Sequence, residues 1–426
     1  MLDLFKTLIA DFHARGVQSR VIRRDLSVPL NTSKAVSIIG PRRAGKTWFL
    51  YSLMEQLRKE TGIRNVVHIN FEDERLRLDA SGLGLIIDAY QQLYSNRPLD
   101  KVYFFLDEIQ NIPGWEKFVR RLAETISPHV FLTGSSARLL DREIAAALRG
   151  RALPYTLFPL SFREYLRFRG EEACDFRGTA GRNRIEALFE RFLREGGYPE
   201  TLAMDEATRN RTLQSYFEIM LYRDIVERFD VRRPHLVKDL ARRLLSGNAQ
   251  VFSVHKYYRD LRSRNVRVTK DALYELADHF IDALFIVQVS KADPSAAKQS
   301  QSLKKYYVND VGLLNACLYT PGEKHGALLE TFVLLELHKN EKKTVYFSGT
   351  NECDFMVLDK GEVAEAIQVC YELTDDNCRR ELAGLQAAMA RFGLKEGLIL
   401  TRRQKKEIKA GSGRILVLPA WEWSLT

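Results

Sequence analysis

The chain has 426 residues, of which 45% are hydrophobic, 28% charged and 10% aromatic. These proportions are those of a packed globular protein, and they exclude a disordered or fibrous chain. Lysine and arginine number 65 against 55 aspartates and glutamates, and the net charge of +10 permits a polyanionic partner without requiring one.

The cysteines and the apolar segments indicate the compartment. The five cysteines show no metal-ligand spacing and are odd in number, which favours a reducing compartment. No stretch approaches the ~18 apolar residues of a membrane span, and the N-terminal segment MLDLFKTLIADFHARG has the pattern of an amphipathic helix rather than a secretion signal. We therefore expect a soluble cytoplasmic protein with no membrane partner.

Up to about residue 160, short apolar runs alternate with stretches of helical periodicity. Fully apolar strands separated by helices are typical of a parallel sheet that is covered on both faces. The sequence therefore predicts an α/β core. The predicted strands are 35–39, 66–70, 102–106 and 130–133.

The first of these strands runs into a phosphate-loop motif. The segment matches G-x-x-x-x-G-K-[ST], and it lies between a predicted strand and a predicted helix. Backbone N–H groups of such a loop cradle phosphates, Lys46 is expected to reach the β- and γ-phosphates of ATP, and Thr47 is expected to hold Mg²⁺. A strand-to-helix turn without a ligand is the alternative. The loop residues are Gly40, Pro41, Arg42, Arg43, Ala44, Gly45, Lys46 and Thr47.

The third strand ends in two acids, Asp107 and Glu108, about 60 residues after the loop. Ligands bind at the carboxyl ends of strands in open α/β sheets. We expect Asp107 to lie on the Mg²⁺ side and Glu108 to activate the attacking water. An ordinary acidic strand end is the alternative interpretation of this pair alone.

The fourth strand is followed by further candidates for catalysis. Thr133 and Ser135 either contact the γ-phosphate or the attacking water, or they cap the next helix. Arg149 and Arg151 are candidates for stabilising charge at the γ-phosphate, within one chain or from a neighbouring subunit. A surface ion pair is the alternative for either arginine.

The stretch from about 162 to 233 has mostly helical periodicity, and a winged helix is predicted after it. Ser253 and Thr269 are expected to cap two successive helices, and strands over 284–289 and 304–308 are expected to form the wing. The second helix carries several acids on its predicted outer face, which disfavours insertion into a DNA groove. Contact with DNA through the first helix and the wing, including Lys304 and Lys305, and a protein-docking role both stay open. The acids are Asp271, Glu275, Asp278 and Asp282.

Several stretches together resemble a known family, the prokaryotic AAA-type ATPases that join an ATPase core, a winged helix and a C-terminal restriction-endonuclease-like domain. The resemblance covers nearly the whole chain, and its motifs are most specific before residue 230. It implies ATP binding and hydrolysis and supplies no cellular role. The stretches are GPRRAGKT (40–47), FLDEIQNIPGWE (105–116), LTGSSARLLDREIAAALRGR (132–151), LFPLSFREYL (157–166), GGYPE (196–200), LYRDIVER (221–228) and LPAWEWSL (418–425).

The C-terminal part departs from the nuclease pattern that the resemblance implies. Such nucleases need an acid on a helix, an Asp on one strand and Glu-x-Lys on the next. Glu330 and Asp354 occupy the first two positions, but Gln368 stands for the Glu and Cys370 for the Lys. Because a thiol cannot replace an ammonium group, we predict a degenerate site without nuclease activity.

The sequence therefore predicts an AAA-type ATPase that binds and hydrolyses ATP with Mg²⁺ and drives a conformational or assembly switch. The candidate partners are DNA and further copies of the same chain in a homo-oligomer that depends on nucleotide. A regulatory or defence-type nucleotide sensor with slow turnover and an ATP-regulated nuclease are the alternatives. The expected domains are an ATPase core with an N-terminal helix (1–160), a helical lid (161–233), a winged helix (234–318) and a restriction-endonuclease-like domain (319–426).

Overall fold

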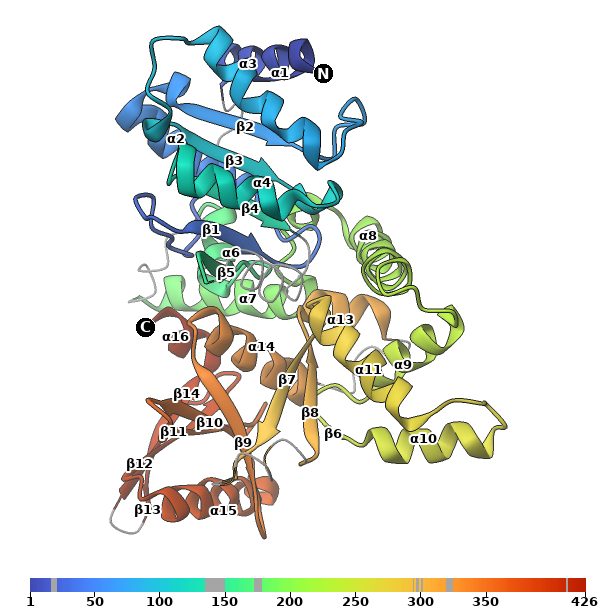
Figure 1. Ribbon diagram of the computed structural model, residues 1–426. Helices are drawn as coiled ribbons and strands as arrows, with labels where there is room; N and C mark the ends of the chain where they lie inside the picture. Colours follow the sequence, from blue (N-terminus) through green and yellow to red (C-terminus); the bar gives the residue numbers. More distant parts are fainter. Residues whose placement is uncertain are drawn as a thin grey trace. The chain divides into compact units, whose positions relative to one another are not determined.

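The computed structural model describes residues 1–16, 21–134, 150–171, 178–293, 295, 299, 302–318, 325–410 and 413–426 (Figure 1). The chain divides into two compact units, Met1–Phe158 and Pro159–Thr426. No helix in these described ranges is long and apolar enough to cross a membrane.

The first unit contains a five-stranded sheet with the strand order β2-β3-β4-β1-β5, and every neighbouring pair is parallel. The four strands predicted from apolar runs are present within about one residue, and β5 is an additional, unpredicted strand at the edge of the sheet. The strands are β1 (Ala35–Ile39), β2 (Val66–Asn70), β3 (Tyr103–Asp107), β4 (Val130–Gly134) and β5 (Ala152–Thr156).

Helices cover both faces of this sheet, which explains why its central strands are apolar throughout. One face packs against α2 through residues such as Leu50 and Met54. The other packs against α1, α3 and α4 through residues such as Phe5, Ile86 and Trp115. The helices are α1 (Leu2–Arg15), α2 (Lys46–Thr61), α3 (Leu85–Leu93) and α4 (Trp115–Arg121). The helix expected over 115–126 is α4 followed by a π-helical turn, Leu122–Ile126.

The second unit begins with helices. In the rest of the unit, helices pack against the strands of a sheet in two apolar clusters. One apolar cluster joins the helices from α8 to α13 with β7 and β8, and a second joins α15 to the strands from β9 to β14. The helices are α6 (Phe162–Phe168), α7 (Thr179–Glu195), α8 (Glu206–Ile219), α9 (Pro234–Ser246), α10 (Val254–Ser263), α11 (Lys270–Asp282), α13 (Val311–Cys317), α14 (His325–Lys339), α15 (Asp375–Phe392) and α16 (Ala420–Leu425).

The strands of this unit form one nine-stranded sheet with the order β13-β14-β12-β11-β10-β9-β7-β8-β6. The expected wing strands β7 and β8 pair antiparallel, and β7 also pairs parallel with β9, which belongs to the C-terminal segment. The strands are β6 (Val251–Phe252), β7 (Ile286–Lys291), β8 (Lys304–Val308), β9 (Lys343–Ser348), β10 (Glu352–Asp359), β11 (Glu362–Val369), β12 (Glu396–Thr401), β13 (Lys406–Ala410) and β14 (Gly413–Pro419).

Candidate nucleotide-binding site

The phosphate-loop motif forms the connection between β1 and α2. Gly45 precedes the helix in the left-handed region, with φ 94°, which glycine adopts without strain. At Gly40, an added Cβ would lie 2.2 Å from the carbonyl oxygen of Leu157, so only glycine fits there. The loop therefore leads directly to a helix N-terminus, where unpaired N–H groups and the helix dipole favour an anion.

Lys46 begins α2 and extends across this loop. Its side chain is 5% exposed, and Nζ donates to the carbonyl oxygens of Gly40 at 3.1 Å and Pro41 at 3.3 Å. The same nitrogen lies 3.6 Å from Oε1 of Glu108. The ammonium group is thus held between the loop and the acid at the end of β3.

Asp107 ends β3 and is fully buried beside two hydroxyl groups. Thr47 Oγ1 donates to its Oδ2 at 2.8 Å, and Thr133 Oγ1 donates to its Oδ1. Burial raises the pKa of Asp107, while the hydrogen bonds from Thr133 and Thr47 act in the opposite direction. A hydroxyl beside a carboxylate offers the hard oxygen ligands that Mg²⁺ prefers, so Thr47 and Asp107 fit the ion that the motif implies.

Glu108 is held in a defined orientation by its neighbours. Its backbone is left-handed, with φ 53°, and its N–H donates to Thr133 Oγ1 at 2.8 Å. Gln110 Nε2 donates to Oε2 of the Glu108 carboxylate. The structure therefore brings Lys46, Thr47, Asp107 and Glu108 together at the carboxyl ends of β1 and β3.

Two buried residues near the site had no motif that could reveal them. Arg24 is 7% exposed and donates to the carbonyl oxygens of Ala44 at 3.0 Å and Phe158 at 2.7 Å, so it supports the loop from behind. His68 on β2 places Nε2 4.0 Å from Asp107 Oδ2, and burial lowers its pKa to about 4, which keeps the ring neutral. Only the approach of distant segments in the fold identifies these two side chains.

Of the other predicted site residues, Arg42 and Arg151 lie beside carboxylates and Thr133 is buried. Arg42 lies 4.0 Å from the Glu72 carboxylate, and Arg151 forms an ion pair with Glu124. Thr133, expected at the γ-phosphate or as a cap, is buried behind Asp107. Ser135 and Arg149 lie outside the described residues.

The nuclease-like residues Glu330 and Asp354 of the second unit contact Lys305. Glu330 and Asp354 lie together, and the Gln368 Oε1 accepts a hydrogen bond from the Asp354 N–H at 3.3 Å. Lys305, expected on the exposed wing, is instead 3% exposed and contacts both acids, because β8 lies inside the continuous sheet. Cys370 Sγ lies 3.5 Å from the side-chain nitrogen of Asn377. In the described part of the chain, no group of three or more His, Cys, Asp or Glu side chains is arranged to hold a metal.

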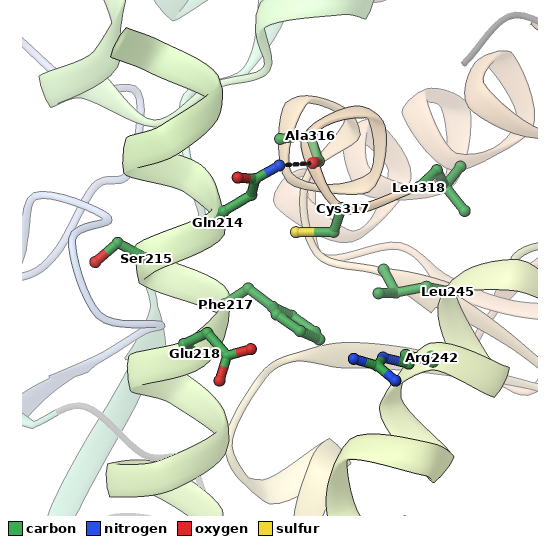
Figure 2. Close-up of a pocket in the computed structure, with 9 residues that line it drawn as sticks. All are labelled: Gln214, Ser215, Phe217, Glu218, Arg242, Leu245, Ala316, Cys317 and Leu318. Carbon is green, nitrogen blue, oxygen red and sulfur yellow. Dashed lines mark hydrogen bonds between the residues drawn. The ribbon is translucent and has the colours of Figure 1, made fainter. Parts of the chain in front are cut away.

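A cavity of about 500 Å³ lies between α8, α9 and the end of α13 (Figure 2). Gln214 crosses one end and donates to the carbonyl oxygen of Ala316 at 2.8 Å. Burial raises the pKa of the Cys317 thiol to about 12, so this sulfur is not an activated nucleophile. The cavity is lined by Gln214, Ser215, Phe217, Glu218, Arg242, Leu245, Ala316, Cys317 and Leu318.

Comparisons with known proteins match two parts of the chain to families. Residues 32–166 match the AAA domain, and residues 186–324 match a domain of unknown function. The first of these segments contains the entire candidate site described above. The second contains the helices α8, α9, α10, α11 and α13 and the strands β6, β7 and β8.

Relatives and solved structures extend the comparison. The chain is 33% identical to an uncharacterised protein of Methanocaldococcus jannaschii over 99% of this chain and 95% of that protein. It is 26% identical to an uncharacterised Haemophilus influenzae protein over 80% of this chain and 83% of the other. The Aeropyrum pernix Orc1 protein in complex with DNA aligns at 12% identity and a TM-score of 0.26, covering 74% of this chain and 91% of that one. The Pyrobaculum aerophilum Cdc6p aligns at 13% identity and a TM-score of 0.24, covering 78% and 92%.

The identity to the M. jannaschii protein extends over almost the full length of both chains. The AAA match contains the phosphate loop, Asp107 at the end of β3 and Glu108 directly after it. The chain therefore belongs to the same family as the M. jannaschii protein, and its N-terminal part is an AAA domain of the P-loop ATPase type.

Proposed function

We propose that the chain binds ATP with Mg²⁺, hydrolyses it, and uses the cycle to drive a conformational or assembly switch. The observation that carries this proposal is the convergence of Lys46 and Thr47 on Asp107 and Glu108. The N–H groups of the loop and the first turn of α2 bind the phosphates, and Lys46 exchanges its carbonyl partners for the β- and γ-phosphates.

The remaining residues divide the chemistry among them. Thr47 and Asp107 would hold Mg²⁺, which, when bound, neutralises charge on the β- and γ-phosphate oxygens. Glu108 orients the attacking water and accepts its proton. Arg24 keeps the loop in position through the Ala44 carbonyl. Each role uses a group that the fold already holds in place.

Two substitutions test this function. Lys46→Ala removes the cation directed at the phosphates, so ATP binding in equilibrium titration should be lost. Glu108→Gln keeps the shape of the side chain but cannot take a proton, so it should bind ATP and hydrolyse it about 100-fold more slowly. Lys59→Ala on the exposed side of α2 is the matched control and should leave both unchanged. Hydrolysis at the wild-type rate by Glu108→Gln would show that another group is the base.

Turnover separates the switch from its two alternatives. A slow nucleotide sensor should bind ATP tightly and release phosphate at a low rate with or without DNA. An ATP-regulated nuclease should cleave DNA in the presence of ATP and Mg²⁺ or Mn²⁺. We expect ATP turnover and no cleavage above background, and cleavage that Asp354→Ala abolishes would place the nuclease first.

DNA is the partner that the surface of the second unit favours. In α10, Lys256, Arg259 and Arg262 are exposed and three residues apart, so they lie on one side of the helix. Within the described residues they form no ion pair. The helices α10 and α11 followed by β7 and β8 keep the order of a winged helix. In α11, Asp271, Glu275 and Asp278 are exposed, whereas Asp282 at the end of the helix, expected outward, is buried.

We therefore propose that DNA phosphates contact α10 rather than α11 or Lys305. Arg259→Glu/Arg262→Glu should weaken duplex binding about tenfold at about 50 mM salt, and it should flatten the salt dependence because fewer counterions are released. Lys342→Glu/Lys343→Glu makes the same charge change at another exposed site and should have little effect. Equal weakening by both double variants would indicate only a net-charge effect.

A further inference from the structure

Lys305, whose side chain is 3% exposed, forms the centre of an ionic cluster in the second unit. Its Nζ lies 3.2 Å from Glu330 Oε1, 2.6 Å from Glu352 Oε1 and 3.2 Å from Asp354 Oδ1. Lys305 comes from β8, Glu330 from α14, and the other two acids from β10, all elements of one unit (Figure 1). We call these four residues the Lys305 cluster.

The distances fit an ammonium group rather than a small divalent ion. Hydrogen bonds from N–H groups to oxygen have lengths of about 2.7–3.2 Å, close to the three distances here, whereas Mg²⁺ needs oxygen ligands at about 2.0–2.1 Å. Two of the acids have a further partner, since Asp354 Oδ2 accepts from the Val369 N–H at 3.0 Å and Glu330 Oε1 also accepts from the Tyr307 hydroxyl at 2.6 Å. The acids are therefore arranged around the lysine.

The charges agree with this arrangement. Burial opposes the charged form of Lys305, but the surrounding carboxylates of Glu330, Asp354 and Glu352 outweigh it and raise the lysine pKa. Burial and the charge of Asp354 raise the pKa of Glu330, whereas the neighbouring ammonium group of Lys305 lowers it. The ammonium group of Lys305 therefore compensates part of the negative charge that the three acids bring together.

We propose that Lys305 is the built-in cation of the nuclease-like site, and that its ammonium group takes the place a divalent metal would occupy between Glu330 and Asp354. The cluster then holds β8, β10 and α14 together and leaves no position for a catalytic metal. This role is independent of the ATPase function, because every residue of the cluster belongs to the second unit.

Removal of the lysine should convert the cluster into a metal site. Nucleotide-free full-length protein is titrated with Mn²⁺, and free Mn²⁺ is followed by electron paramagnetic resonance. Lys305→Ala should gain one site that binds Mn²⁺ at least about tenfold more tightly than any site of the wild type. Mn²⁺ should also raise its melting temperature, since a ligand stabilises the state that binds it. Lys305→Ala/Asp354→Asn should lose the new site, and Lys304→Ala is the matched control.

Two results would overturn the proposal. The first is a wild-type Mn²⁺ site that disappears in Asp354→Asn, because the acids would then bind metal beside the lysine. The second is a folded Lys305→Ala that takes up no more Mn²⁺ than the wild type. The wild-type titration tests the proposal even if Lys305→Ala does not fold. If the wild type has no Mn²⁺ site that depends on Asp354, the result supports Lys305 as the built-in cation.

Discussion

Gln110 contacts Glu108, the proposed general base. The sequence around Gln110 gives no sign of this contact. Its side-chain N–H₂ group donates to Glu108, and within the described residues its amide oxygen is buried without a hydrogen-bond partner. An amide placed in this way restricts the rotamers of the carboxylate. We infer that Gln110 is a positioning residue for Glu108.

Gln110→Ala should therefore lower kcat for ATP by about tenfold and leave KM nearly unchanged, because the variant keeps all phosphate contacts. Steady-state phosphate release measures both constants. Asn111→Ala, one residue further along the same turn, is the control for local disturbance. A rise in KM with unchanged kcat would mean that Gln110 acts on binding instead.

Gly40 permits a second test at a single atom. An added Cβ would lie 2.2 Å from the Leu157 carbonyl oxygen, so Gly40→Ala must displace the loop and should abolish ATP binding. We expect a destabilisation of about 1–3 kcal/mol, measured by urea unfolding. Gly178→Ala is the control, since its Cβ meets nothing within 4 Å. Wild-type ATP affinity in Gly40→Ala would show that the loop tolerates the shift.

At the scale of elements, the GGYPE segment after α7 docks against the start of α13. Asp310 accepts the Gly197 N–H at 2.6 Å and the Leu313 N–H at 2.8 Å. At Gly312, an added Cβ would lie 2.1 Å from the Glu195 carbonyl oxygen, so the two backbones touch. Burial raises the pKa of Asp310 from 3.8 to about 6, although both N–H groups act against that shift.

This shift predicts a pH dependence of stability. Between pH 3.8 and about 6 the folded protein holds a proton on Asp310 that the unfolded chain releases. The free energy of unfolding should therefore fall as pH rises through this window, by about 3 kcal/mol from this group at ~1.4 kcal/mol per pKa unit. Urea unfolding from pH 4 to 7 measures it. Asp310→Asn should flatten the slope relative to wild type, and the exposed Asp88→Asn should not; equal slopes would contradict the assignment.

Local signals predicted much of the element structure. Ser253 and Thr269 cap α10 and α11 as expected, because a capping hydroxyl is a short-range feature. The phosphate-loop motif and the acids Asp107 and Glu108 were also found from local sequence patterns. The pairing of β7 with β9 and the burial of Lys305 depend on segments about 50 residues apart in the chain, and no local pattern encodes such pairings.

At the scale of the whole molecule, the proposed switch raises the question of whether Arg151 acts at the ATP site of a neighbouring subunit. Arg151 forms an ion pair with Glu124 of its own chain, and its side chain is still 53% exposed. If it completes a neighbouring ATP site, Arg151→Ala should bind ATP but hydrolyse it about 1,000-fold more slowly. Glu124→Gln removes the same ion pair and should retain turnover. Equal losses in both variants would assign Arg151 a structural role.

Light scattering tests the assembly directly. With saturating Mg²⁺-ATP, the Glu108→Gln variant should stay bound to ATP and form a larger species. The reason is that ATP hydrolysis, which would otherwise cause disassembly, is slowed. Lys46→Ala under the same conditions should stay at its nucleotide-free size. A Glu108→Gln protein that keeps its size would mean that the switch works within one chain.

The continuous sheet limits how this protein can be divided. A cut near residue 318 would separate β7 from β9 and leave a row of unpaired N–H and C=O groups along β7. The same cut would separate Lys305 from Glu330, Glu352 and Asp354 and leave a buried ammonium group without its counterions. A truncated form should therefore aggregate through the open strand, and in evolution the two segments are expected to be inherited and exchanged as one piece.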